Sequence, residues 1–118
     1  MPTLIANLSI GKGTWGHVGR LIEDDQWDKV ILITNDYGKE NFTKNNKTEF
    51  IVINASSGLQ QLRDVLYTSL KEKIKDSEVA VNFISGSGKE HMVLLAALLK
   101  LGVGIRLIAL TKEGIKEL

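Results

Sequence analysis

Short apolar runs alternate with segments of helical periodicity along this chain, and each apolar run predicts a strand. The predicted strands are Thr3–Leu8, Lys29–Thr34, Glu49–Asn54, Glu78–Ile84 and Val103–Leu110. The run Lys29–Thr34 is continuous, which is typical of a strand buried on both faces of a sheet. The tail after Leu110 is short and polar, and we expect no further element there.

The segments between the runs predict helices whose ends are marked by capping residues. The expected helices run from Trp15 to about Glu23 after a cap at Thr14, across Leu59–Leu70 after a cap at Ser56 or Ser57, and from Lys89 to Leu101 before a stop at Gly102. The polar segment Asn35–Lys47 is expected to be a loop, with at most a helical turn around Lys39–Phe42.

This alternation of strands and helices predicts one α/β domain, residues 1–118, built on a doubly wound parallel sheet with helices on both faces. The expected strand order is 3-2-1-4-5. In such a sheet the first and fourth strands are neighbours at the point where the strand order reverses. Ligands bind there, at the carboxyl ends of the strands.

Composition narrows the classes of partner. The net charge is +1, which favours neither DNA nor a membrane surface. Cysteine is absent and there are two histidines, so we expect no metal, no cofactor and a reducing, cytoplasmic location. The start Met1-Pro2-Thr3 lacks the positive segment of a signal peptide, and the apolar stretch Met92–Leu99 is too short to cross a bilayer.

Two glycine-rich loops follow the first and fourth predicted strands, Ser9–Gly16 and Ser85–Glu90. Each offers backbone N–H groups, hydroxyls and one lysine at the start of a helix, which is suited to an anionic ligand. Both loops lie at the strand-order reversal, so we predict a nucleotide-like ligand. The candidate ligand-binding residues are Ser9, Ile10, Gly11, Gly13, Thr14, Ser85, Gly86, Ser87, Gly88, Lys89 and Glu90.

Other interpretations of the first loop stay open. Residues 11–16 match the pattern G-x-G-x-x-G, and Asp36 follows at the distance of a ribose-binding acid. This favours an alternative function, a regulatory module that binds NAD or an adenosine nucleotide. The glycines could instead only let the chain turn into a helix, as in an interaction protein without a small ligand.

The second loop is not a nucleotide triphosphatase motif, because Phe83 and Glu90 occupy the glycine and hydroxyl positions that such a loop needs. Lys89 stands at a helix start, where a cation is unfavourable unless an anion binds beside it. Two histidines, His17 and His91, lie in first helical turns and have no assigned role. Asn82 lies within the fourth strand, where its amide needs a partner.

The segment Met92–Leu101 is apolar on nearly all sides. A helix of this kind is buried on more than one face. One face would cover the sheet, and we expect the other to meet a second copy of the chain in a symmetric homodimer. The alternative is that other helices of the same chain cover it.

The sequence from Asn82 to Met92 resembles the CARF domains (CRISPR-associated Rossmann fold), which take part in antiviral defence. Their usual loop after the fourth strand resembles Thr/Ser-Gly-Gly-Thr-Lys-x-Met. Here Ser85–Met92 resembles this loop in its lysine, Lys89, and in its methionine, Met92, which follows one residue later, with a different Gly/Ser order. The first loop, Ser9–Thr14, is also similar. The resemblance therefore implies that the predicted α/β fold is Rossmann-like.

The resemblance implies a homodimer that binds a cyclic oligoadenylate with both loops of both subunits. Some members of the family, the ring nucleases, cleave that ligand without metal through attack of a ribose 2′-hydroxyl on the adjacent phosphate. In that case Lys89 and Lys12 would stabilise the phosphorane, and Ser9 or Ser87 would orient the phosphate. The chain has no room for an effector domain, which implies a stand-alone binder, a ring nuclease or the partner of a separate effector.

Overall fold

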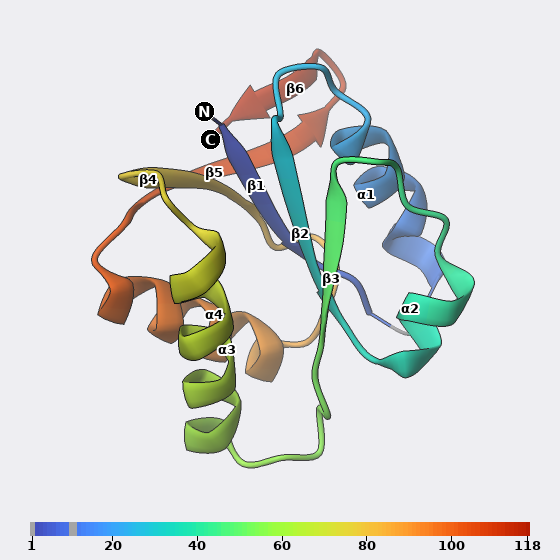
Figure 1. The fold of residues 1–118 in the computed structure, drawn as a ribbon. Coiled ribbons are helices and arrows are strands. Elements are labelled where there is room, and N and C mark those ends of the chain that lie inside the picture. Colours follow the sequence, from blue (N-terminus) through green and yellow to red (C-terminus); the bar gives the residue numbers. More distant parts are fainter. Residues whose placement is uncertain (1, 10–11) are drawn as a thin grey trace.

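A six-stranded sheet forms the centre of the protein in a computed structural model that describes residues 2–9 and 12–118 (Figure 1). The strands are β1 (Thr3–Asn7), β2 (Lys29–Thr34), β3 (Thr48–Val52), β4 (Glu78–Asn82), β5 (Gly104–Thr111) and β6 (Gly114–Glu117). Their order is β3-β2-β1-β4-β5-β6, and the first five pair in parallel. This confirms the predicted doubly wound sheet.

Helices cover both faces of the sheet. They are α1 (Trp15–Ile22), which follows a short 3-10 turn at Lys12–Thr14, α2 (Asp36–Asn41), α3 (Leu59–Lys73) and α4 (Gly88–Leu101). The strand order reverses after β3, and right-handed crossovers therefore place α1 and α2 on one face and α3 and α4 on the other (Figure 1). Among the described residues, no helix has both the length and the apolar character needed to cross a membrane.

Each layer of helices closes its own hydrophobic core. On the α3–α4 side, Ile5, Ile31 and Val81 of the sheet pack with buried leucines of both helices. On the α1 side, Leu4, Ala6, Val30 and Leu32 pack with Val18, Leu21 and Trp27. Residues of β1 are therefore buried on both faces, which agrees with the apolar residues Leu4–Ala6 at its centre.

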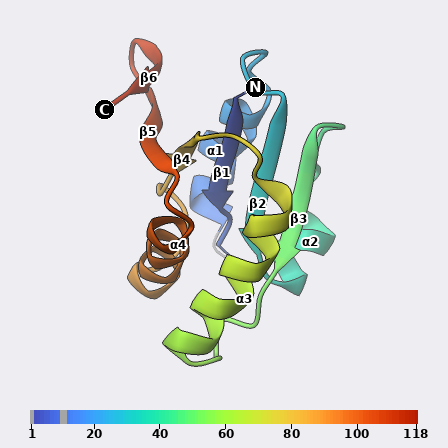
Figure 2. The same cartoon turned by 60° about the vertical axis from the view of Figure 1, so that its left-hand side comes forward.

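The expectation of a structureless tail is wrong. Residues 114–117 form β6, which pairs antiparallel with β5 at the edge of the sheet opposite β3 (Figure 2). Gly114 has a φ of 104°, which lets the chain reverse direction. Arg106 on β5 pairs with Glu117 at 2.8 Å. The strand was missed because its pairing depends on main-chain bonds to β5, not on an apolar run.

The segment after β2 also differs from its prediction. The helical turn expected around Lys39–Phe42 is part of a longer helix, α2, which begins at Asp36, and its N-cap Asn35 accepts a hydrogen bond from the Gly38 N–H at 2.9 Å. The predicted caps of α3 are wrong as well. Gly58 occupies the N-cap position, and the Ser56 hydroxyl donates to Asn54 Oδ1 at 2.7 Å.

Two other predicted helix ends are confirmed in position. Thr14 is the N-cap of α1, although its side chain makes no capping bond. Gly102 ends α4 in the left-handed conformation, with a φ of 76°.

Gly38 lies where α2 approaches β2 closely. A Cβ at this position would lie 1.9 Å from Thr34 Oγ1, which donates a buried hydrogen bond of 2.9 Å to the Leu8 carbonyl. Gly38→Ala must displace Thr34, and we expect a loss of about 1–3 kcal/mol in the free energy of unfolding. Urea denaturation measures this loss.

Gly16→Ala is the matched control, because Gly16 is also helical and a Cβ there would meet nothing within 4 Å. This variant should be unchanged or slightly more stable. Equal destabilisation by both substitutions would show that the contact with Thr34 does not limit residue 38.

Candidate functional site

The two glycine-rich loops lie side by side, because β1 and β4 are parallel neighbours with Ala6 opposite Asn82. The loops are also bonded directly, since the Ser9 N–H donates to Ser85 Oγ at 2.8 Å. We call the described residues of the two loops, 9, 12–14 and 85–90, the two-loop site. Ile10 and Gly11, two predicted ligand-binding residues, lie outside the described residues.

Trp15 holds the first loop in place. Its indole N–H donates to the Ser9 carbonyl at 2.7 Å, and its ring packs edge-on against Phe42 with centroids 5.6 Å apart. The Lys12 ammonium lies 5.7 Å from the centre of the Trp15 ring and 5.9 Å from that of Tyr37 on α2. Lys12 is therefore directed towards α2 and is exposed.

Close packing determines the shape of the second loop. Gly86 has a φ of 105°, and a Cβ there would lie 3.1 Å from the Asn7 Cβ. The site therefore needs glycine at residue 86 for both its conformation and the space it leaves. His91 Nε2 lies 2.8 Å from the Ser85 carbonyl, which can only accept, so this nitrogen is the donor.

Ser87 and Glu90 form a capping box at the start of α4. The Glu90 N–H donates to Ser87 Oγ at 3.2 Å, and the Ser87 N–H donates to Glu90 Oε1 at 2.7 Å. These bonds assign the Glu90 carboxylate a structural role. The Ser87 hydroxyl accepts in the box, and its own proton can still be donated to a ligand.

Lys89 reaches across the site instead of pointing back into α4. Its Nζ donates to the Ala55 carbonyl in the β3–α3 connection at 3.0 Å. Within residues 2–9 and 12–118, neither Lys89 nor Lys12 pairs with a carboxylate. The two predicted phosphate-binding lysines therefore keep their positive charges available to an anion.

Asn7 is a residue of this site that the sequence analysis missed. It is fully buried below the second loop, and neither polar atom of its side chain has a partner in the described part of the chain. The signal was present, because Asn7 is a polar residue inside the apolar run Thr3–Leu8. In contrast, the amide of Asn82 donates to the Ile108 carbonyl at 2.8 Å and accepts from the Ile84 N–H.

Gly13 and Gly16 of the first loop lack the close packing that glycines have in a dinucleotide site. There the third glycine lets the helix pack closely on the strand. Gly16 is exposed, and a Cβ at Gly13 or Gly16 would meet nothing within 4 Å. The described part of the G-x-G-x-x-G match thus lacks the close packing of helix on strand for which the third glycine of this pattern is needed.

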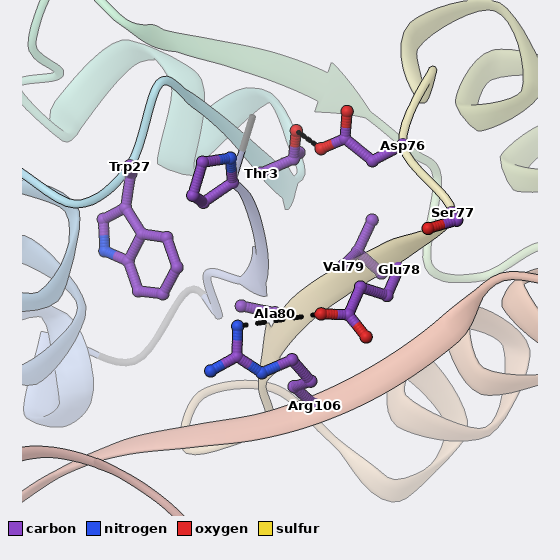
Figure 3. A pocket seen from close by; sticks show the side chains of 9 residues that line it. Thr3, Trp27, Asp76, Ser77, Glu78, Val79, Ala80 and Arg106 are labelled. Atoms are coloured by element: carbon purple, nitrogen blue, oxygen red, sulfur yellow. Dashed lines mark hydrogen bonds and ion pairs between the residues drawn. The ribbon is translucent and has the colours of Figure 1, made fainter.

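The opposite edge of the sheet holds a separate pocket of about 310 Å³ at the amino ends of β1 and β4 (Figure 3). Arg106 lies 3.9 Å from Glu78 there, and the Thr3 hydroxyl donates to Asp76 at 3.1 Å. Arg106 thus offsets the charge of Glu78, and Asp76 is held by a hydrogen bond. The pocket does not belong to the two-loop site.

The α4 helix is covered only in part by α3. Val93, Leu94, Ala97 and Leu98 are buried in the core. Met92 and Leu99 remain 64% and 65% exposed. Packing within the chain thus accounts for one face of α4 and leaves another apolar face uncovered.

Exposed apolar side chains also follow β4 and lie on β5 and at the C-terminus. Ile84, Leu107 and Leu118 are exposed and line a groove of about 210 Å³. We call the exposed residues Ile84, Met92, Leu95, Leu99, Leu107 and Leu118 the α4–β5 face.

No cluster of histidine and carboxylate side chains among the described residues has the geometry of a metal site.

His17 joins α1 to the strands that carry the second loop. Its Nε2 accepts from the Leu110 N–H at 3.2 Å and lies 3.3 Å from Asn82 Nδ2. Burial lowers the pKa of His17 below its ordinary value of 6.5. The neutral ring is therefore the form that these contacts favour.

This shift predicts a pH-dependent stability. The unfolded chain binds a proton at His17 more readily than the folded protein, so the free energy of unfolding falls as the pH drops through 6.5 towards the lower folded pKa. His17→Gln keeps an acceptor for Leu110 and should lose less stability between about pH 8 and pH 5. If the free energy of unfolding fell equally with pH in both proteins across this range, His17 would not be the source of the pH dependence.

Comparison with known proteins supports the fold. No family model matches the chain, and no curated protein matches it. Among solved structures it is similar to Enterococcus italicus Csm6 bound to cyclic hexa-2′-fluoro-hexa-dAMP, with a TM-score of 0.62 and 14% identity. The match covers 95% of this chain and 34% of that one, so the chain spans about a third of Csm6. The similarity shows a shared mixed α/β, Rossmann-like fold.

Proposed function

We propose that the protein binds a cyclic oligoadenylate at the two-loop site as a homodimer of CARF type. The observation that carries the proposal is the convergence of two loops, bonded from Ser9 to Ser85, with two lysines that have no carboxylate partner in the described chain. Glycine-rich backbone and lysines at the reversal of a doubly wound sheet suit a phosphate-bearing ligand. The similarity in fold to a Csm6 structure with a cyclic nucleotide bound supports this ligand class.

The α4–β5 face supports the homodimer. It comprises several large apolar side chains that are exposed on α4, after β4 and on β5, where a monomer gains nothing from them. A two-fold axis at this face would bring two copies of the two-loop site to one ligand. Each copy would contribute Lys12 and Lys89, which suits a ring that carries a phosphate on every nucleotide.

The same site could also cleave its ligand. A ribose 2′-oxygen would attack the neighbouring phosphorus, and the bond from phosphorus to the 5′-oxygen would break, which opens the ring and leaves a 2′,3′-cyclic phosphate. Lys12 and Lys89 would stabilise the charge that grows on the phosphorane, and the Ser87 hydroxyl would donate to a phosphate oxygen. Binding is the primary proposal, and cleavage is measured alongside it.

Lys89→Ala tests the site. The change removes a charge-assisted hydrogen bond to phosphate, so we expect cyclic oligoadenylate affinity to fall by about ten-fold to a hundred-fold. Calorimetry with cyclic tetra-adenylate and cyclic hexa-adenylate measures the loss, with NAD and AMP as comparison ligands. If the protein cleaves the ring, single-turnover cleavage should slow by a larger factor than binding weakens.

Lys75→Ala is the control for charge. Lys75 is exposed and precedes β4, so it lies near the amino ends of the parallel strands, away from the two-loop site. Its loss should leave affinity unchanged. Equal effects of the two substitutions, or tight binding of NAD alone, would contradict a cyclic oligoadenylate site at Lys89.

Leu99→Glu tests the homodimer. A carboxylate in the middle of the α4–β5 face would have to be buried between two copies, so the variant should be monomeric in light scattering at concentrations where the parent is a dimer. Its ligand affinity should fall as well. Val65→Glu on α3 is the control, because Val65 is also an exposed helical side chain. A monomeric parent protein at high micromolar concentration would rule out the shared site.

A further inference from the structure

A second pocket adjoins the two-loop site at the carboxyl ends of β2 and β3. We call it the side pocket, and its volume is about 680 Å³. Its lining residues are Asn35, Asp36, Tyr37, Val52, Ile53, Asn54, Ala55 and Ser56. The pocket thus lies between the start of α2 and the connection from β3 to α3.

Both lysines of the two-loop site reach the side pocket. The Lys89 ammonium donates to the carbonyl of Ala55, a lining residue, at 3.0 Å. The Lys12 ammonium lies 5.9 Å from the ring centre of Tyr37, another lining residue. A ligand whose phosphates rest on these lysines would therefore have the side pocket directly beside it.

The side pocket offers the groups that a ribonucleoside needs. Tyr37 and Val52 are 42% and 38% exposed and provide an aromatic face and an aliphatic side chain for a base. Asp36 provides a carboxylate that makes no ion pair or side-chain hydrogen bond within the described residues. The side chain of Asn54 is already engaged, because its Oδ1 accepts from Ser56.

We propose that the side pocket takes one ribonucleoside unit of the ligand and that Asp36 accepts a hydrogen bond from its ribose 2′-hydroxyl. In a 3′,5′-linked ring the 3′- and 5′-hydroxyl groups of each ribose are esterified, so the 2′-hydroxyl is the only hydrogen-bond donor on the sugar. An ionised carboxylate can only accept. Asp36 therefore makes the site selective for ribonucleotides over 2′-deoxynucleotides, and Tyr37 places the attached base.

This inference rests on the proposed function and deepens it. It also gives Asp36 a new role. From the sequence, Asp36 belonged only to the dinucleotide alternative, in which the first loop would hold the pyrophosphate. The contacts of Lys12 with Tyr37 and of Lys89 with Ala55 instead place the side pocket, which Asp36 lines, beside the two-loop site.

The test compares cyclic hexa-adenylate with its all-2′-deoxy counterpart on the parent protein, Asp36→Ala and Asp36→Asn, by calorimetry. The parent should prefer the ribose ring by about ten-fold or more, since the missing hydroxyl leaves the carboxylate unpaired. The preference should shrink to about two-fold in Asp36→Ala and be intermediate in Asp36→Asn, whose amide oxygen still accepts. The ratio is the readout, because loss of a negative charge alone strengthens the binding of both polyanions.

Asp25→Ala is the matched control, because Asp25 is exposed and precedes β2 at the opposite edge of the sheet. It should keep the full preference of the parent. Equal affinity of the parent for both rings, or an unchanged preference in Asp36→Ala, would overturn the side-pocket assignment and leave the proposed function intact. Binding of neither ring by the parent, together with no binding of cyclic tetra-adenylate, would overturn the proposed function itself and the inference with it.

Discussion

The parallel pairing of β4 with β1 is the constraint on which this structure depends. The chain completes β1, β2 and β3 in one direction across the sheet and then returns past β1 to add β4. Had β4 continued beside β3, the two glycine-rich loops would lie three strands apart. The reversal instead brings the carboxyl ends of β1 and β4 together, and it sends α3 and α4 to the face opposite α1 and α2.

The reversal also determines how polar groups enter the centre of the sheet. Asn7 and Asn82 end the two adjacent strands and point to opposite faces, since Asn7 lies below Gly86 and Asn82 contacts His17 on the α1 side. The Asn82 amide is satisfied by backbone groups and fixes the start of the second loop. Asn7 is the more costly residue, because a buried amide without partners among residues 2–9 and 12–118 lowers stability. Stability alone would favour an apolar residue at position 7.

Much of the fold could be predicted because strands and helices depend on local patterns of apolar and polar residues that repeat along the chain. The run Lys29–Thr34 coincides with β2, and Gly102 marks the end of α4. What was missed depends on tertiary contacts. The strand β6 forms through its main-chain bonds to β5, and Gly58 takes the N-cap position of α3 while Ser56 is engaged by Asn54. The position of the two loops followed from the strand order, but the Ala55 carbonyl and the side pocket come from a connection with no motif of its own.

The bond from the Ser9 N–H to Ser85 Oγ has a consequence for the dynamics of the site. This amide is held by a side chain of another segment, so this bond protects it from solvent exchange while the two loops stay together. Opening of the loops would expose Ser9 without breaking any strand pairing of β1 or β4. Amide exchange at this single residue therefore reports a local opening whose free energy can be far below that of global unfolding. The neighbouring amides of the sheet, which unfold with the core, provide the internal reference for that measurement.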